Sequence, residues 1–139
     1  IFAISFNLVN GFLNGYYFGN VEYNLEVSSF NFIFGLIVLI IGVLINISAD
    51  NTLLKLKEKK NEYQIPKGFL YNYISCPNYL GEIIEWLGFA IMASSIPAFL
   101  FFLWTIFNLL PRAISHHKWY KNNFENYPNK RKAIIPFLI

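Results

Sequence analysis

The sequence predicts an all-α, multi-pass transmembrane helical bundle with about four spans in its 139 residues. Hydrophobic residues make up 55% of the chain, charged residues make up only 14%, and the mean hydropathy is +0.41, which is more apolar than ordinary soluble domains. The stretch FNFIFGLIVLIIGVLINISA, residues 30–49, carries no charge and has the ~20 residues that a helix needs to cross a ~30 Å hydrocarbon core. We therefore predict a transmembrane helix over 30–50.

The first span covers residues 1–19, which are apolar from the first residue onward. Because the segment has neither an initiator Met nor a basic leading region, it is a poor match to a signal peptide, and we interpret the chain as beginning inside a span. Gly11, Gly15 and Gly19 recur every four residues and share one helix face. Small residues at this spacing favour close helix contact in membranes, so we expect another helix to pack against them.

Two more spans are expected over 77–95 and 97–117, joined by a tight turn at SSIP. One long span over 83–110 is the alternative. Pro97 suits the first turn of a new helix, where its missing N–H is not needed, and one of the two serines before it can act as the N-cap. These features favour two helices.

The positive charges decide between the two arrangements. Lysines cluster in the 51–76 loop, and lysines with an arginine cluster in the tail after residue 117. Cytoplasmic segments carry such an excess near helix ends, and two intervening spans put both clusters on that side, whereas one span would separate them. The loop at 20–29 holds Glu22 and Glu26 but no Lys or Arg, and it falls on the opposite side. We therefore expect a helical hairpin and a cytosolic C-terminus.

The rest of the composition argues against several classes of function. The net charge of +3 is small, and the basic residues form two clusters next to spans, which does not suit a nucleic-acid partner. Cys76 is the single cysteine, so the chain has no disulfide framework or cysteine-rich metal site, and it contains no H-E-x-x-H motif. Neither G-x-G-x-x-G nor the P-loop pattern occurs. We expect no nucleic acid and no metal.

Three spans carry polar side chains at four-residue spacing, which lie on one face of a helix. Such groups are costly in a membrane and indicate a functional site or internal pairing. If the faces meet at one depth, they line a pocket open to the cytosol, with amides and carboxylates for hydroxyl or amide groups and an arginine for phosphate. A dinucleotide requires this mixture. The residues are Asn46 and Asp50 in the second span, Asn78, Glu82, Glu85 and Trp86 in the third, and Arg112, His116 and Tyr120 in the fourth.

Each of these groups also has a purely structural interpretation. Glu82 and Arg112 could neutralise each other across the hairpin, and Asp50 could mark the interfacial end of its helix. His116 and His117 could be interfacial side chains. A non-enzymatic transporter fragment, with the polar faces along a permeation path, is the competing class of protein, although the chain contains no internal repeat.

Four segments are distinctive in combination: NISADNTLLKLK, YQIPKGFLYNYISCPNYLGEIIEWLGFAIM, NLLPRAISHHKWY and FENYPNKRKAIIPFLI. In order and spacing they resemble the C-terminal half of the steroid 5α-reductase (3-oxo-5α-steroid 4-dehydrogenase) family, and the match runs from about Asn10 to the last residue. The trans-2-enoyl-CoA reductases of very-long-chain fatty acid elongation are similar around SCPNY and GFAIM. GEIIEW and PRAISHHKWY favour the steroid branch, and the enoyl-CoA reductase is the alternative.

The resemblance implies a seven-helix membrane enzyme that uses NADPH to reduce the C4–C5 double bond of a 3-oxo-Δ4-steroid. Residues 1–139 would be its membrane-embedded NADPH-binding part, in the endoplasmic reticulum membrane or, in a bacterium, the cell membrane. The family's general acid, a Tyr supported by a Glu, belongs to the N-terminal half. We therefore assign no catalytic residue and expect this chain alone to be inactive.

The family's cofactor contacts can be carried over by position. Trp86 is expected near the nicotinamide and the substrate. Lys57 and Gln64 stand where many members have Arg, so the phosphate contacts of this loop are expected to differ. The cofactor-contacting positions are Asn46, Asp50, Tyr63, Asn78, Glu82, Arg112, His116, Tyr120 and Arg131.

Overall fold

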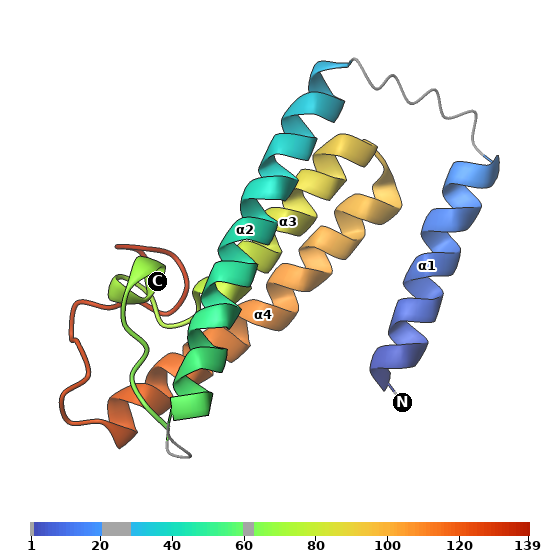
Figure 1. Cartoon of the computed structure of the whole chain (residues 1–139). Coiled ribbons are helices and arrows are strands. Elements are labelled where there is room, and N and C mark those ends of the chain that lie inside the picture. The colour runs from blue at the N-terminus through green and yellow to red at the C-terminus, as the bar shows by residue number, and fades with distance from the viewer. Residues whose placement is uncertain (1, 21–28, 60–62) are drawn as a thin grey trace.

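The computed structural model describes residues 2–20, 29–59 and 63–139. Within these ranges the structure is built from helices and contains no β-strand, which confirms the all-α prediction. Each of the four expected spans corresponds to one helix (Figure 1). The elements are α1 (Phe2–Asn20), α2 (Phe30–Lys59), the 3-10 helix η1 (Phe69–Asn72), α3 (Pro77–Ala93) and α4 (Ile96–Asn123).

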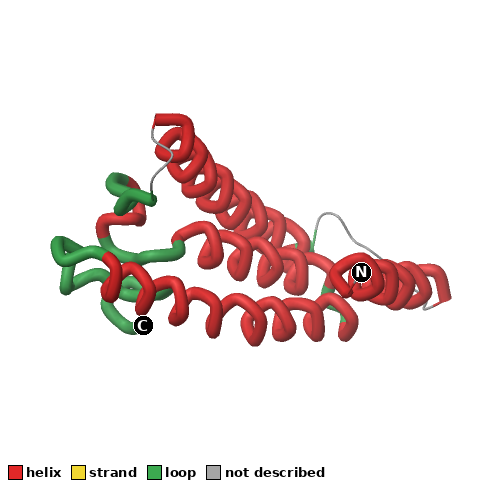
Figure 2. The backbone as a smooth tube through the Cα atoms, turned by 90° about the horizontal axis from the view of Figure 1, so that it is seen from below, coloured by secondary structure: helices red, strands yellow, loops and turns green. Residues whose placement is uncertain are grey.

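The helices form a membrane bundle in which α3 is central. It packs against both α2 and α4, while α1 lies to one side and contacts α4 (Figures 1 and 2). Among the described residues, two helices are long and apolar enough to cross a membrane by length and composition, over Phe30–Lys57 and Ile96–Asn123.

The predicted hairpin between α3 and α4 is confirmed. Ser94 ends α3 in the left-handed conformation, with φ of 45°. Ser95 is the N-cap of α4, and its hydroxyl accepts a hydrogen bond from the Ala98 N–H at 3.4 Å. Pro97 then occupies the first turn of α4, where proline costs no intrahelical hydrogen bond.

Two of the predicted helix ends are wrong. The second span was expected to end at residue 50, yet α2 continues to Lys59, and α4 continues to Asn123 instead of ending at 117. The polar residues predict where the hydrocarbon core ends. They do not end the helix, because Leu, Lys and Glu are good helix formers in water as well.

Glycines bring the backbones of α2 and α3 into contact. Gly35 and Gly42 on α2 face Gly88 and Gly81 on α3, two helical turns apart on each helix. A Cβ added at any of the four would overlap backbone atoms of the facing helix. Because the two helices are this close, the polar residues at the end of α2 lie next to the start of α3.

The helix contact predicted at the glycines of the first span is not found among the described residues. A Cβ added at Gly11, Gly15 or Gly19 would meet no atom within 4 Å in the described part of the chain. Four-residue spacing places these glycines on one face, but it does not determine which helix packs there. In the described residues, the close helix contact on α2 occurs instead at Gly35 and Gly42, which are seven residues apart.

A compact layer of loop and tail covers the ends of α2 and α4. The 73–76 segment pairs with the tail through a parallel bridge between Ile74 and Lys132, and the Ser75 N–H donates to the Lys132 carbonyl at 2.8 Å. Tyr71, Ile74 and Ile134 fill the inner side of this layer, where each is at most 1% exposed. The tail therefore packs on the 73–76 segment, next to the region where the polar helix faces end (Figure 1).

Candidate functional site

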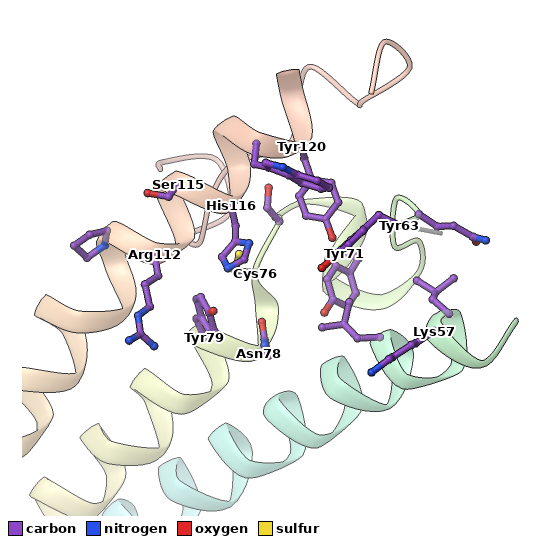
Figure 3. A pocket seen from close by; sticks show the side chains of 16 residues that line it. Lys57, Tyr63, Tyr71, Cys76, Asn78, Tyr79, Arg112, Ser115, His116 and Tyr120 are labelled. Carbon is purple, nitrogen blue, oxygen red and sulfur yellow. The ribbon is translucent and has the colours of Figure 1, made fainter. Parts of the chain in front are cut away.

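A cavity of about 1050 Å³ opens where the ends of α2 and α4 meet the start of α3 and the segment before it (Figure 3). The helices contribute its long walls, and residues 63–76 contribute the wall nearest the tail. Its lining combines two side-chain amides, cations, an imidazole and several phenols with apolar side chains. The polar side chains are Lys57, Tyr63, Gln64, Tyr71, Ser75, Asn78, Tyr79, Arg112, Ser115, His116 and Tyr120.

The α4 wall carries the three residues that four-residue spacing predicted to share a face. Arg112, His116 and Tyr120 all line the cavity, and Figure 3 shows them projecting from one side of α4. The His116 ring lies edge-on to the Tyr79 ring of α3, with centroids 6.0 Å apart. The Tyr120 ring stacks on Tyr127 of the tail at 5.5 Å. The helix rhythm thus places one positive charge, one imidazole and one phenol along the cavity.

The opposite wall begins at the contact between α2 and α3. Asn78 lines the cavity, and its backbone carbonyl accepts a hydrogen bond from Asn46 Nδ2 at 3.3 Å. Asn46 therefore orients the start of α3 without lining the cavity itself. Asp50, one turn further along α2, is exposed and is not part of the lining.

Glu82 and Trp86 follow Asn78 on the same face of α3 but lie beyond the cavity. Glu82 is half-buried, and no salt bridge joins it to Arg112, although both residues are described. Trp86 packs against the Phe101 ring of α4, with centroids 4.2 Å apart.

Trp86 also lines a second cavity, of about 280 Å³, between α1, α2 and α3. Glu85 and the amides Asn10 and Asn14 border this cavity. Asn14 Nδ2 donates to the Asn10 carbonyl at 3.0 Å, whereas Asn14 Oδ1 is buried without a partner. The small cavity therefore presents a hydrogen-bond acceptor and a carboxyl group beside an aromatic wall.

Arg131 lies in the tail behind the cavity wall and is only 3% exposed. Its Nη2 donates to the Pro66 carbonyl at 3.2 Å, and its Cζ lies 5.1 Å from the centre of the Tyr127 ring. Nε and Nη1 are buried and have no hydrogen-bond partner. A buried guanidinium with two unpaired donors is costly, so this site suits an anion.

No sequence pattern predicted the hydrogen-bond cluster around Ser75. Its Oγ lies 2.6 Å from His117 Nδ1 and 2.5 Å from the Tyr127 hydroxyl, and it donates to the Lys132 carbonyl at 3.0 Å. The set is balanced when Tyr127 and the Nδ1–H of His117 both donate to Ser75. His117, which had no predicted role, thus ties α4 to the tail. These residues are too far apart in sequence for any local pattern to pair them.

Two other lining groups are held in their neutral forms. Burial, followed by the nearby Tyr120, Cys76 and Asp50, raises the pKa of Tyr71 well above its ordinary value, and its hydroxyl donates to the Ala49 carbonyl at 3.4 Å. Burial raises the pKa of the Cys76 thiol to about 12. Near neutral pH, Tyr71 is therefore a hydrogen-bond donor and Cys76 is not a nucleophile.

Comparisons with known proteins agree with the resemblance found in the sequence. The family model described as 3-oxo-5-alpha-steroid 4-dehydrogenase matches residues 1–139. Steroid 5-alpha-reductase DET2 of Solanum lycopersicum is 46% identical, and 3-oxo-5-alpha-steroid 4-dehydrogenase 2 of Rattus norvegicus is 42% identical. Each match covers 98% of this chain and 54% or 55% of the relative, so the chain spans about half the length of these relatives. The chain belongs to the 3-oxo-5-alpha-steroid 4-dehydrogenase family.

Proposed function

We propose that this chain is the NADPH-binding part of a membrane reductase that saturates the C4–C5 double bond of 3-oxo-Δ4-steroids. The observation that supports this most is the large cavity with Arg112, His116, Tyr120 and Asn78 on facing helices. Its volume of about 1050 Å³ lies at the upper end of the ~300–1,000 Å³ typical of ligand pockets, which suits a dinucleotide better than a small metabolite.

The cationic wall would hold the phosphates of NADPH. Arg112 offers a planar fork of donors, and Lys57 lines the same cavity from α2. His116 and Tyr120 add neutral or charged donors on the Arg112 face. Arg131 places a further positive charge behind the Tyr120 and Tyr127 stack, with two nitrogens unpaired. Tyr63, in the loop wall, adds a phenol at the open side.

The face of α3 would lead from the cofactor to the substrate. Asn78, Glu82 and Trp86 are four residues apart, so the row extends about 12 Å along the helix. In this proposal Asn78 and Glu82 fix the nicotinamide carboxamide, and Trp86 borders the reacting end, next to the small cavity. Asn46 and Asp50 would address hydroxyls toward the adenosine end.

When bound, NADPH supplies the hydride for an electron-poor double bond. The residues of this chain bind and orient it, since hydride transfer requires the reacting atoms at near-attack distance. No catalytic residue is assigned here, because the proposed general acid lies in the upstream half of the family's proteins. The apolar surface around Trp86 would admit a lipid-like enone from the bilayer, and the cofactor would enter from the cytosolic side of the endoplasmic reticulum membrane.

The test is NADPH affinity of the full-length protein in nanodiscs. Arg112→Gln should weaken binding about 10- to 100-fold, because a charge-assisted hydrogen bond contributes about 1.5–3 kcal/mol. Lys118→Gln is the matched control, since Lys118 is an exposed cation on the same helix that does not line the cavity. Equal affinities for all three proteins would overturn the assignment of this site. Turnover of a 3-oxo-Δ4-steroid and of a trans-2-enoyl-CoA then separates the two substrate classes.

A further inference from the structure

The outer face of the tail layer carries four large apolar side chains. Phe69 of η1 is 52% exposed and Tyr73 after it is 50% exposed, while Phe137 and Leu138 in the C-terminal turn are 83% and 67% exposed. The Tyr73 and Phe137 rings lie with their centroids 6.0 Å apart, so the two segments form one surface. We call these four residues the outer patch.

The layer is apolar on its inner face as well. Tyr71, Ile74 and Ile134 lie on that face and are at most 1% exposed, packed toward the helices. A layer that faced water on its outside would carry polar side chains there, and a contiguous apolar surface instead marks an interaction site. The outer patch therefore needs an apolar partner beyond the described part of the chain.

Both phenylalanines of the outer patch have a left-handed backbone conformation. Phe69 has a φ of 46° and Phe137 a φ of 66°, a region that bulky residues rarely adopt. Hydrogen bonds of the C-terminal turn hold Phe137 there, including Ile134 N–H to the Ile139 carbonyl at 2.9 Å. Both residues are at least half exposed, so the described residues bury neither ring fully.

The position of the layer relative to the predicted hydrocarbon core identifies the partner of the outer patch. The Tyr71 hydroxyl donates to the Ala49 carbonyl, which joins η1 to one level of α2. Ala49 closes the uncharged run that starts at Phe30, and at 1.5 Å per residue this run is about 30 Å long, the thickness of the hydrocarbon core. η1 therefore sits where α2 leaves the hydrocarbon. Lys67 and Lys132 flank the patch in sequence, as cations do near lipid headgroups.

We propose that the outer patch is an interfacial anchor that inserts among the headgroups and upper acyl chains of the bilayer. Aromatic rings are well suited to that region, because they combine an apolar body with tolerance of a polar boundary. The anchor holds the tail, with Tyr127 and Arg131, against the end of the bundle. This inference rests on depth and exposure, and it does not require the proposed cofactor.

The experiment measures the surroundings of a nitroxide label at position 137. Phe137→Cys and the control Lys130→Cys, an exposed position in the same tail, are made in the full-length protein after replacement of its other reactive cysteines. Cys76 can remain, since it is only 5% exposed. In phosphatidylcholine nanodiscs, collision rates with oxygen, which concentrates in lipid, and with a water-soluble nickel chelate are compared by power saturation.

The label at 137 should collide several-fold more with oxygen than with nickel, and the label at 130 should show the reverse. Phe69→Cys provides a second probe in the other segment and should behave like Phe137→Cys. Free access of nickel at both patch positions would overturn the proposal, since the patch would then face water. Exclusion of both reagents would also overturn it, because a protein segment would then cover the patch.

Discussion

Replacing Ser75 with alanine should destabilise the folded protein, because this one hydroxyl joins three segments. It contacts His117 of α4, the Tyr127 hydroxyl and the Lys132 carbonyl at 2.5–3.0 Å. A hydrogen bond contributes about 0.5–1.5 kcal/mol net, so the loss of three predicts about 1.5–4.5 kcal/mol. Tyr127 is only 5% exposed, so little water can replace the lost partner, and the upper half of this range is expected.

The assay is thermal unfolding of the full-length protein in detergent, together with NADPH titration. Ser75→Ala should lower the unfolding temperature by several degrees and weaken NADPH binding, because Tyr127 stacks on Tyr120 of the cavity wall. Ser115→Ala is the matched control, since Ser115 lines the same cavity but is exposed. It should leave the unfolding temperature near that of the wild type.

A wild-type unfolding temperature for Ser75→Ala would refute the reasoning, as would an equal loss in Ser115→Ala. The cluster can also be tested as a unit with Tyr127→Phe. Residues that share one hydrogen-bond network are not additive, so the double variant should lose less stability than the two single variants combined. Additive losses would mean that Ser75 and Tyr127 act separately.

Four further results are expected. Gly42→Ala should destabilise the protein by about 1–3 kcal/mol in thermal unfolding, because the added Cβ would overlap the Glu85 backbone. Gly15→Ala is the control and should not destabilise it, since a Cβ at Gly15 meets no atom within 4 Å in the described residues. Equal effects of the two substitutions would contradict the packing of α2 on α3. Cys76, whose pKa rises from 9.0 to about 12, should resist iodoacetamide at pH 8 until the protein unfolds. The unfolded thiol ionises first, so stability should fall as pH rises from about 9 toward 12, and the decline should be smaller in Cys76→Ala, where the phenols of Tyr71 and Tyr120, whose pKa burial also raises, still contribute. Residues 1–139 alone should reduce no steroid, and measurable turnover by this chain would contradict a general acid in the upstream half.

Features that depend on local geometry could be predicted from the order of the residues alone. An uncharged run of twenty residues predicts a span, and the distribution of lysines predicts the hairpin of α3 and α4. Ser95 and Pro97 mark the start of α4, as its N-cap and in its first turn. The four-residue rhythm placed Arg112, His116 and Tyr120 on one face, because the α-helix repeats every 3.6 residues whatever surrounds it.

Which helix faces meet could not be predicted from local spacing and is seen only in the folded chain. Gly35 and Gly42, not the glycines of α1, make the close contact in the described residues, because helix contact depends on a partner that the spacing does not specify. Ser75, His117 and Tyr127 become one cluster only when the tail folds back onto α4. The polar row was expected to line a single pocket. Instead, Asn78 and the α4 residues line a large cavity, Glu85 and Trp86 border a small one, and Asn46, Asp50 and Glu82 line neither. The distance along α3 and the packing of its neighbours determine which groups share a cavity.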